Sequence, residues 1–337
     1  MTMDLDAALR SPRATLFDAP VGAVESVGPG RIGVVGMPSD WTHSSRIGAR
    51  EGPAALRRAS RDIARTYSSR DQGRLVDPAD GSLWCWQAGE RLVDCGDATV
   101  DPMSVEATTE AIAAMTAEVA AQGGIPLALG GDHYNSYPAC LGYSRALEMR
   151  APEACFGYIQ IDGHLDFSDT LGAWGSHNHA TNARRIAELP NVVPENMVWI
   201  GVTGWVDGDD LSEIEARGGR VFSSGDVHSM GAGRVADEAV GHATRGVAHL
   251  YLSIDIDAMD AGYLPGTGSI VPSAITPRQY CQMLDVIGKG PVDGLDICEV
   301  APSLDPSGRT EQIAAHMLFR VLRHHLLTQH RRGVGLV

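Results

Sequence analysis

Short apolar runs alternate with helix-forming segments along almost the whole chain, and this alternation restricts the fold more than any other feature. The apolar runs that we predict to be buried strands span residues 31–37, 92–94, 125–129, 156–161, 197–202, 220–222, 248–254 and 292–297. The segments with a helical spacing of apolar residues span 53–59, 104–122, 135–149, 210–217, 232–245, 277–287 and 308–329. Strands that alternate with helices are typical of a parallel sheet covered on both faces. We therefore predict an α/β protein with three αβα layers around a central, mostly parallel sheet.

No linker or change of composition divides the chain. Residues 1–30 contain three prolines and no clear period, which indicates an irregular N-terminal arm, and residues 31–337 are predicted to form a single domain. Residues 67–89 are polar and Gly-rich, and they predict a long excursion from the pattern. Trp84 and Trp86 in this excursion either pack an arm or reach an active site of the same or a neighbouring chain, and we favour packing.

Charge and composition exclude several classes of function. A formal net charge of −15 argues against a nucleic-acid partner, which needs a basic surface, and it would favour the approach of a cationic small molecule. No apolar run is long enough for a transmembrane helix and the N-terminus lacks a signal-peptide pattern, so we expect no membrane partner. Six scattered cysteines without a Cys-x-x-Cys pair suggest reduced thiols and a cytoplasmic location.

Three of the predicted strands lead directly into acids and histidines. The run 156–161 is followed by Asp162-Gly163-His164-Leu165-Asp166, where an extended backbone would place both acids and the imidazole on one face. The run 125–129 leads to Gly130-Gly131-Asp132-His133, and the run 250–254 leads to Asp255-Ile256-Asp257. Ligands of parallel α/β sheets bind beyond the carboxyl ends of the strands. We therefore expect one cluster made of His133, Asp162, His164, Asp166, Asp255 and Asp257.

Such a cluster needs positive charge, because buried carboxylates repel one another unless they are paired. Four carboxylates and two imidazoles are too many for one divalent ion. They suit two ions bridged by shared carboxylates, as in two-metal hydrolases whose ions lie about 3.5–4 Å apart. Oxygen-rich ligands with some imidazole and no thiolate favour Mn²⁺, with Ni²⁺ and Co²⁺ as alternatives. Any one of the three motifs alone would be weak support, but three polar loops of this kind are hard to explain by chance.

Together these motifs resemble those of the ureohydrolases, the family that comprises arginase, agmatinase, guanidinobutyrase and formiminoglutamase. The resemblance covers roughly residues 31–330, in the family's order, and its matching stretches are 48–53, 130–133, 162–166, 253–260, 264–268 and 296–302. The Pro-Gly-Thr-Gly stretch at 265–268 is more similar to the agmatinase branch than to arginase. The resemblance implies the arginase/deacetylase-like form of the three-layer fold.

The resemblance also implies two Mn²⁺ ions per chain. One ion would be held by His133, Asp162, Asp166 and Asp255, and the other by Asp162, His164, Asp255 and Asp257. A hydroxide bridging the ions would attack the guanidinium carbon of the substrate, and Asp166 would orient that hydroxide by a hydrogen bond.

Further residues acquire roles from the resemblance. Glu299, beside the last strand, would pair with the substrate guanidinium, since a carboxylate matches that planar fork of donors. A histidine soon after the Asp162 motif would protonate the leaving amine, and here His177 fits best while His179 is a rival. Asn178 and His179 differ from the family's usual residues in this substrate-facing loop, so they too are expected to bear on substrate binding.

The implied function is hydrolysis of a guanidino compound to urea and an amine, with agmatine as the leading substrate. A guanidino acid such as guanidinobutyrate, or a small guanidine or biguanide, would suit the same chemistry. Alternatives from other classes are a single-zinc deacetylase-like amidohydrolase and a non-catalytic subunit of a hetero-oligomeric ureohydrolase, although the complete ligand set argues against both. Family members imply a homo-oligomer, either a trimer or a hexamer, or a hetero-oligomer with a paralogue.

Overall fold

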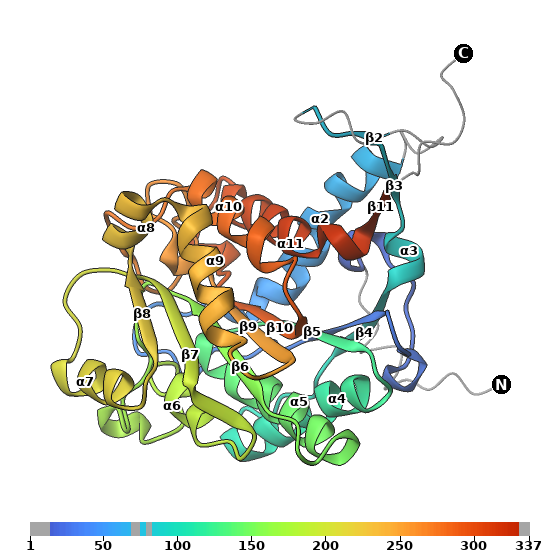
Figure 1. The fold of residues 1–337 in the computed structure, drawn as a ribbon. Helices are drawn as coiled ribbons and strands as arrows, with labels where there is room; N and C mark the ends of the chain where they lie inside the picture. Colours follow the sequence, from blue (N-terminus) through green and yellow to red (C-terminus); the bar gives the residue numbers. More distant parts are fainter. Residues whose placement is uncertain (1–13, 69–74, 79–82, 330–337) are drawn as a thin grey trace.

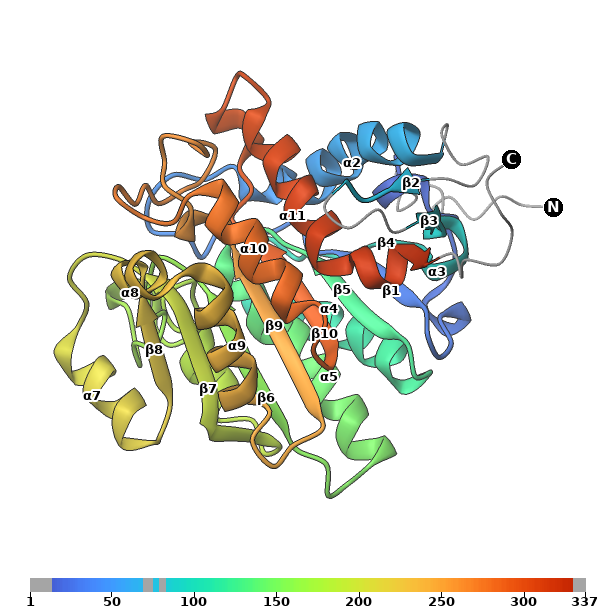
Figure 2. The same cartoon turned by 45° about the horizontal axis from the view of Figure 1, so that its top comes forward.

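The structure, a computed structural model, describes residues 14–68, 75–78 and 83–329. A sheet of eight strands lies at its centre, and every neighbouring pair in this sheet is parallel (Figure 1, Figure 2). Its strands are β1 (Ile32–Gly36), β4 (Leu92–Asp97), β5 (Ile125–Leu129), β6 (Phe156–Ile161), β7 (Val192–Val202), β8 (Arg220–Ser223), β9 (His249–Asp255) and β10 (Val292–Cys298). Their spatial order is β4-β1-β5-β10-β9-β6-β7-β8. The predicted α/β class is thereby confirmed.

Helices cover both faces of the sheet and complete the three layers. One face carries α2 (Gly52–Ser68), α9 (Ala232–Ala243), α10 (Pro277–Ile287) and α11 (Arg309–Leu326), which share one hydrophobic cluster with the strands. The short helices α3 (Ala88–Arg91) and α8 (Ser224–Met230) contribute to the same cluster. The opposite face carries α4 (Val105–Ala121), α5 (Ser136–Arg150), α6 (Asn182–Ala187) and α7 (Gly208–Ala216), packed on a second cluster. None of the described helices is both long and apolar enough to cross a membrane.

Local sequence signals set where these helices begin. Thr276 and Gln279 form a capping box at the start of α10, in which each side chain accepts from the other residue's backbone N–H. Ser104 caps α4 by accepting from Ala107 N–H. Behind the caps, each helix turns an apolar stripe to the sheet, and full burial of one Leu, Ile or Val contributes about 1.5–3 kcal/mol.

The N-terminal arm is irregular where the structure describes it, yet it belongs to the core. Residues 14–30 contain two single-turn 3-10 helices, η1 (Leu16–Asp18) and η2 (Val24–Ser26). Leu16 and Phe17 are nonetheless buried, and Leu16 N–H donates to the Asp94 carboxylate at 3.0 Å. The first 13 residues of the predicted arm lie outside the described residues.

A second, antiparallel sheet has no counterpart in the sequence prediction. It consists of β11 (Leu327–Gln329), β3 (Leu83–Trp86) and β2 (Leu75–Val76), and it falls partly within the predicted excursion 67–89, of which 69–74 and 79–82 lie outside the described residues. The helix predicted to run to 329 ends instead at Leu326, because the next residue takes extended angles and pairs with Trp86. Trp86 packs against Tyr67 and Phe319, with ring centroids 5.7 and 6.3 Å away, in agreement with the packing interpretation.

Candidate dinuclear metal centre

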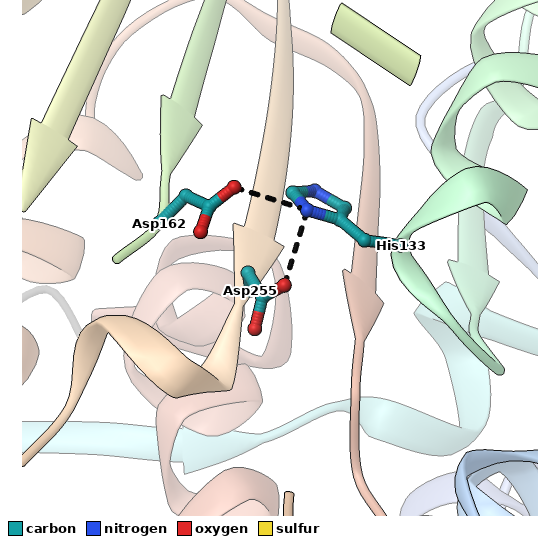
Figure 3. A group of neighbouring side chains, drawn as sticks. All are labelled: His133, Asp162 and Asp255. Atoms are coloured by element: carbon teal, nitrogen blue, oxygen red, sulfur yellow. Dashed lines mark ion pairs between the residues drawn. The ribbon is translucent and has the colours of Figure 1, made fainter. Parts of the chain in front are cut away.

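Four central strands end beside one another, and each leads into one of the residues singled out from the sequence. The strands β5, β10, β9 and β6 are neighbours in the sheet. The residues at their ends are His133 after β5, Glu299 after β10, Asp255 at the end of β9 and Asp162 after β6. Because parallel strands present their carboxyl ends at one edge, these side chains meet there. Figure 3 shows Asp162 and Asp255 directed at the His133 ring.

The first cluster surrounds one nitrogen of His133. Nδ1 of this buried ring lies 3.1 Å from Asp162 Oδ2, 2.8 Å from Asp166 Oδ2 and 3.0 Å from Asp255 Oδ2. Although three carboxylates lie this close, Nδ1 makes no hydrogen bond within the described part of the chain. Buried polar atoms are nearly always hydrogen-bonded, so an unbonded nitrogen at which three carboxylates converge indicates the position of a cation.

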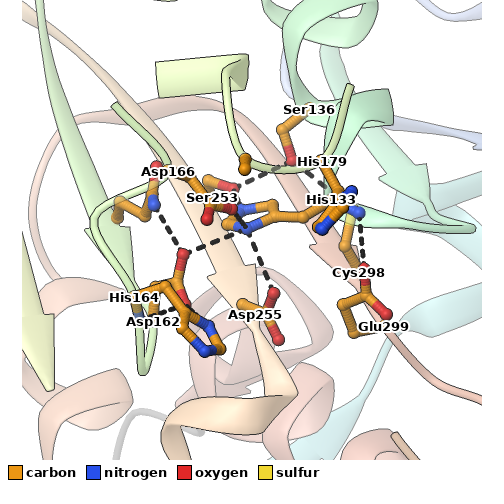
Figure 4. Close-up of polar contacts among 12 residues, drawn as sticks. His133, Ser136, Asp162, His164, Asp166, His179, Ser253, Asp255, Cys298 and Glu299 are labelled. Carbon is orange, nitrogen blue, oxygen red and sulfur yellow. Dashed lines mark hydrogen bonds and ion pairs between the residues drawn. The ribbon is translucent and has the colours of Figure 1, made fainter. Parts of the chain in front are cut away.

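In its neutral form, the His133 ring would donate its one proton from its other nitrogen, because the hydroxyl beside that nitrogen has an acceptor of its own. Nε2 is 3.1 Å from Ser253 Oγ (Figure 4). This hydroxyl donates in turn to Asp296 Oδ1 at 2.9 Å. Nδ1 therefore turns a lone pair toward three carboxylates, which is unfavourable unless positive charge lies between them. Burial lowers the pKa of His133, but Asp255 and Asp162 raise it by more, so that it lies well above its ordinary value. The raised pKa likewise means that the surrounding carboxylates stabilise a positive charge at this ring.

The second cluster adjoins the first and shares Asp162 with it. His164 Nδ1 is 3.4 Å from Asp162 Oδ1 and 3.2 Å from Asp257 Oδ2. Ligand atoms of Asp162, His164 and Asp257 lie within 4.8 Å of one another, and the same holds for His133, Asp162 and Asp255. The two oxygens of Asp162 thus face different imidazoles, which is the arrangement of a bridging carboxylate. The side chain of His164 is 44% exposed, so the second cluster lies on the solvent side.

The backbone around the clusters is itself specialised. Asp166 has φ +48°, a left-handed conformation that residues with a side chain seldom adopt, and its Oδ2 faces His133 from this turn. Burial, followed by the charge of Asp162, raises the pKa of Asp166 to about 7. Asp255 Oδ1 accepts from Asp257 N–H at 2.7 Å, which ties the two clusters together. The sharing of Asp255 between two ions stays a prediction.

The residues present fit two divalent cations. Burial raises the pKa of Asp255 and of Asp257, so these carboxylates resist ionisation until cations neutralise them. The donors are carboxylate oxygens and imidazole nitrogens without a thiolate, a set that suits Mn²⁺. The six candidate ligands predicted from the sequence therefore lie together at one edge of the sheet.

Glu299 lies at the same edge, buried beside a histidine that the sequence motifs do not mark. Glu299 Oε1 accepts from His133 N–H at 2.8 Å, and Oε2 lies 3.4 Å from His43 Nε2. Burial lowers the pKa of His43, but Glu299, with smaller contributions from Asp132 and Asp257, raises it above its ordinary value. His43 follows the first strand in a polar loop without motif spacing. Its closeness in sequence to the stretch 48–53 is the one signal that could have drawn attention to it.

The loop that contains the predicted proton donor places its two histidines, His177 and His179, in different surroundings. His177 is exposed, and its ring lies 6.2 Å from that of Tyr134 and 6.0 Å from that of Tyr137. Asn178 is buried and uses its amide within the loop, donating to Gly175 O at 2.7 Å. His179 stacks on His43 with ring centroids 4.6 Å apart. The structure thus brings His179, rather than His177, next to the surroundings of Glu299, while the roles of all three loop residues stay predictions.

The solvent side of the site opens into a cavity of about 190 Å³. Its lining includes His164 and Asp166 from the clusters, together with Trp205, Asp207 and Asp210. Asp207 and Trp205 are exposed, and Asp210 accepts a hydrogen bond from Ser168 at 2.8 Å. A molecule that approaches the candidate metal centre through this cavity passes acidic side chains.

Fold and site together define a class: three-layer α/β proteins with two adjoining clusters of metal-ligating side chains at the carboxyl edge of a parallel sheet. The family model described as "Arginase family" matches residues 30–323. The chain therefore belongs to the arginase family, and it is a hydrolase of the ureohydrolase type.

Individual relatives agree with this assignment over most of their length. The chain is 30% identical over 293 residues to a guanidinopropionase from Pseudomonas aeruginosa, covering 87% of this chain and 86% of that protein. It is 29% identical over 293 residues to an agmatinase from Chromobacterium violaceum, covering 85% and 81%. The solved structure of proclavaminate amidinohydrolase from Streptomyces clavuligerus matches with a TM-score of 0.77 and 24% identity over 94% of this chain and 98% of that one. The names of these relatives agree on the family and differ in substrate.

The link from His133 through Ser253 to Asp296 leads to a prediction about metal affinity. Ser253→Ala removes the acceptor that holds the Nε2 proton of His133, so we expect Mn²⁺ affinity at the His133 cluster to fall by about 10–100-fold. The ion at the His164 cluster should be retained. Titration of the metal-free chain with Mn²⁺ measures both. Ser144→Ala is the matched control, since Ser144 is equally buried but bonds to Asn191, and equal affinities in the two variants would contradict the prediction.

Proposed function

We propose that this chain is a dinuclear metal-dependent amidinohydrolase that cleaves a guanidino compound to urea and an amine. The observation that carries the proposal is the pair of ligand clusters joined by Asp162, with the buried acid Glu299 bonded to the backbone of His133. A single-zinc hydrolase would not need the second cluster. We propose residues 31–337 as the one catalytic domain, in keeping with the span of the family match.

The proposed ligands are those expected from the sequence. The first ion would be held by His133, Asp162, Asp166 and Asp255, and the second by Asp162, His164, Asp255 and Asp257. When bound, the two ions supply Lewis acidity and activate a water for attack on the guanidinium carbon. Mn²⁺ is the proposed metal, with Ni²⁺ and Co²⁺ as alternatives.

The chain's own residues bind the substrate and handle its protons. Glu299 would receive two N–H groups of the guanidinium, and its burial strengthens this charged contact. Asp166 Oδ2 would accept a hydrogen bond from the attacking water. The proton for the leaving amine is proposed to come from the loop of His177 and His179. The pKa of each ring is lowered by loss of solvent, which is partial at His177 and greater at His179.

The proposed substrate is a guanidino compound with a second positive charge, with agmatine first. The acids Asp207 and Asp210 that line the cavity and the net charge of −15 support a cationic tail. Guanidino acids are the second candidate class, because the relative from Pseudomonas aeruginosa is a guanidinopropionase. A trimeric or hexameric assembly and a cytoplasmic location are further proposals, and light scattering of the purified chain tests the assembly.

A urea-release screen tests the proposed function. The purified chain, loaded with Mn²⁺, Ni²⁺ or Co²⁺ in turn, is incubated with agmatine, guanidinopropionate, guanidinobutyrate, guanidine and a biguanide. We expect urea with the highest kcat/KM for agmatine. A higher kcat/KM for a guanidino acid than for agmatine would show that the proposed substrate is wrong, while the proposed class of hydrolase would still hold. Absence of urea from every compound and metal would overturn the function.

The positions of the two loop histidines lead to a separate prediction. His179→Ala removes the ring stacked on His43, so we expect kcat/KM to fall by roughly tenfold or more, equivalent to about 1.4 kcal/mol. His177→Ala removes an exposed ring, so it should change kcat/KM by less than about threefold. Steady-state kinetics with metal content measured in parallel decide between them. The reverse order would support His177 as the proton donor that the sequence favours.

A further inference from the structure

His43 is a buried histidine that belongs to neither ligand cluster, and it lies where three loops meet. It is 6% exposed. Its Nε2 lies 3.4 Å from Glu299 Oε2, while the other oxygen of Glu299 accepts from His133 N–H at 2.8 Å. Glu299 Oε1 therefore has a hydrogen-bond donor, while Oε2 makes no hydrogen bond within the described residues and has His43 Nε2 within ion-pair distance.

The neighbours of His43 determine which nitrogen carries the proton. Nδ1 accepts a hydrogen bond from Ser45 N–H at 3.0 Å, so Nδ1 has no hydrogen of its own. The ring proton consequently lies on Nε2, the nitrogen that is 3.4 Å from Glu299 Oε2. An ionised carboxylate has about four acceptor positions, so Glu299 keeps free lone pairs for a guanidinium beside its hydrogen bond from His133 N–H and its contact with His43.

The orientation of the His43 ring is restricted by its neighbours. His179 stacks on it at 4.6 Å with 13° between the planes, and His179 is itself held by Thr42 O at 2.8 Å. Gly268 also borders the ring, and a Cβ at this residue would lie 2.4 Å from His43 Nε2. Arg46 joins the two loops by donating to Thr267 O at 2.7 Å. The glycine that ends the Pro-Gly-Thr-Gly stretch thus has a physical reason in this chain, because it leaves room for the imidazole.

We propose that His43 is a positioning residue that fixes the carboxylate plane of Glu299 for the substrate guanidinium. The inference rests on the proposed function, because it takes the guanidinium as the partner of Glu299. Without the His43 ring beside Oε2, the Glu299 carboxylate would be freer to rotate about its terminal bond. Holding the carboxylate in the binding orientation before the substrate arrives lowers the entropy lost on binding.

Three substitutions at His43 test this role. His43→Ala is expected to raise KM for the best guanidino substrate at least about tenfold, with kcat changed less than about threefold and the metal content unchanged. His43→Gln can place an amide N–H where Nε2 lies and should restore most of the affinity. His43→Asn places its amide where Nδ1 lies and should not. A KM in His43→Ala within about twofold of the parent chain, or equal KM values for the Gln and Asn variants, would overturn the proposal.

Calorimetric titration of the Mn²⁺-loaded chain with guanidinium chloride, matched against sodium chloride, provides a readout that does not need turnover. Guanidinium should bind the parent chain and His43→Gln, and at least about tenfold more weakly His43→Ala and Gly268→Ala. Equal binding by all four chains, or no binding by the parent chain, would contradict the role of His43. An absence of urea alongside the expected binding order would instead count against the proposed function alone.

Discussion

Replacement of Asp162 by alanine should remove both metal ions and lower urea release by at least about a thousandfold, a loss of roughly 4 kcal/mol of transition-state stabilisation. The reason is that Asp162 belongs to both clusters, with Oδ2 facing His133 and Oδ1 facing His164. Without Asp162, each cluster loses the carboxylate oxygen that faces its imidazole. Metal analysis after dialysis and a urea assay, performed on the same sample, measure the two losses together.

Single-cluster variants sharpen this test. Asp257→Ala should empty the position beside His164 while leaving an ion beside His133. His133→Ala should do the opposite, and both variants should lose activity. Asp169→Ala is the control, because this acid lies soon after the Asp162 motif but is 72% exposed and pairs with Arg185. Full metal content in Asp162→Ala would contradict the shared-ligand assignment.

Replacement of Glu299 by glutamine is expected to lower kcat/KM by about 100-fold or more, roughly 2.7 kcal/mol, while both metal ions remain bound. Gln has nearly the same shape and its oxygen can still accept from His133 N–H, as Glu299 Oε1 does at 2.8 Å. Its amide NH₂ would then face both His43 Nε2–H and the substrate guanidinium. Donors would meet donors, and the negative charge that neutralises the substrate would be lost.

The comparison of substrates makes this second prediction specific. The loss in Glu299→Gln should appear with every guanidino compound that the parent chain hydrolyses, since Glu299 is proposed to contact the end that they share. An Asp207→Asn variant removes the charge of an exposed acid that lines the cavity. It should lower kcat/KM for agmatine more than kcat/KM for guanidino acids. A kcat/KM for Glu299→Gln within about threefold of the parent would remove Glu299 from the substrate site.

Much of the fold and the candidate metal ligands could be predicted from the sequence, for one physical reason. Buried parallel strands are continuous apolar runs, so 125–129, 156–161 and 248–254 were recognisable without knowledge of their order in the sheet. In a parallel sheet all carboxyl ends lie at one edge, so the acids and imidazoles after these runs had to approach one another. The observed order β5-β10-β9-β6 places these ends side by side.

Features that depend on contacts distant in sequence could not be predicted in the same way. The small sheet pairs residues 83–86 with 327–329, and neither segment has a pattern that specifies the other. His43 is defined by its contacts with Glu299, His179 and Gly268, which come from three separate loops. The choice between His177 and His179 depends on how one loop folds, and a Ser-His-Asn-His sequence does not specify which ring turns inward.

The central claim is that ligands from three strand ends hold two neighbouring cations that share Asp162. Electron paramagnetic resonance of the chain titrated with Mn²⁺ tests it most directly, because two Mn²⁺ ions about 3.5–4 Å apart are magnetically coupled. We expect binding to saturate at two ions per chain with a coupled signal that Asp162→Ala abolishes. Saturation at a single ion, or two ions that give only the spectrum of isolated Mn²⁺, would contradict the account.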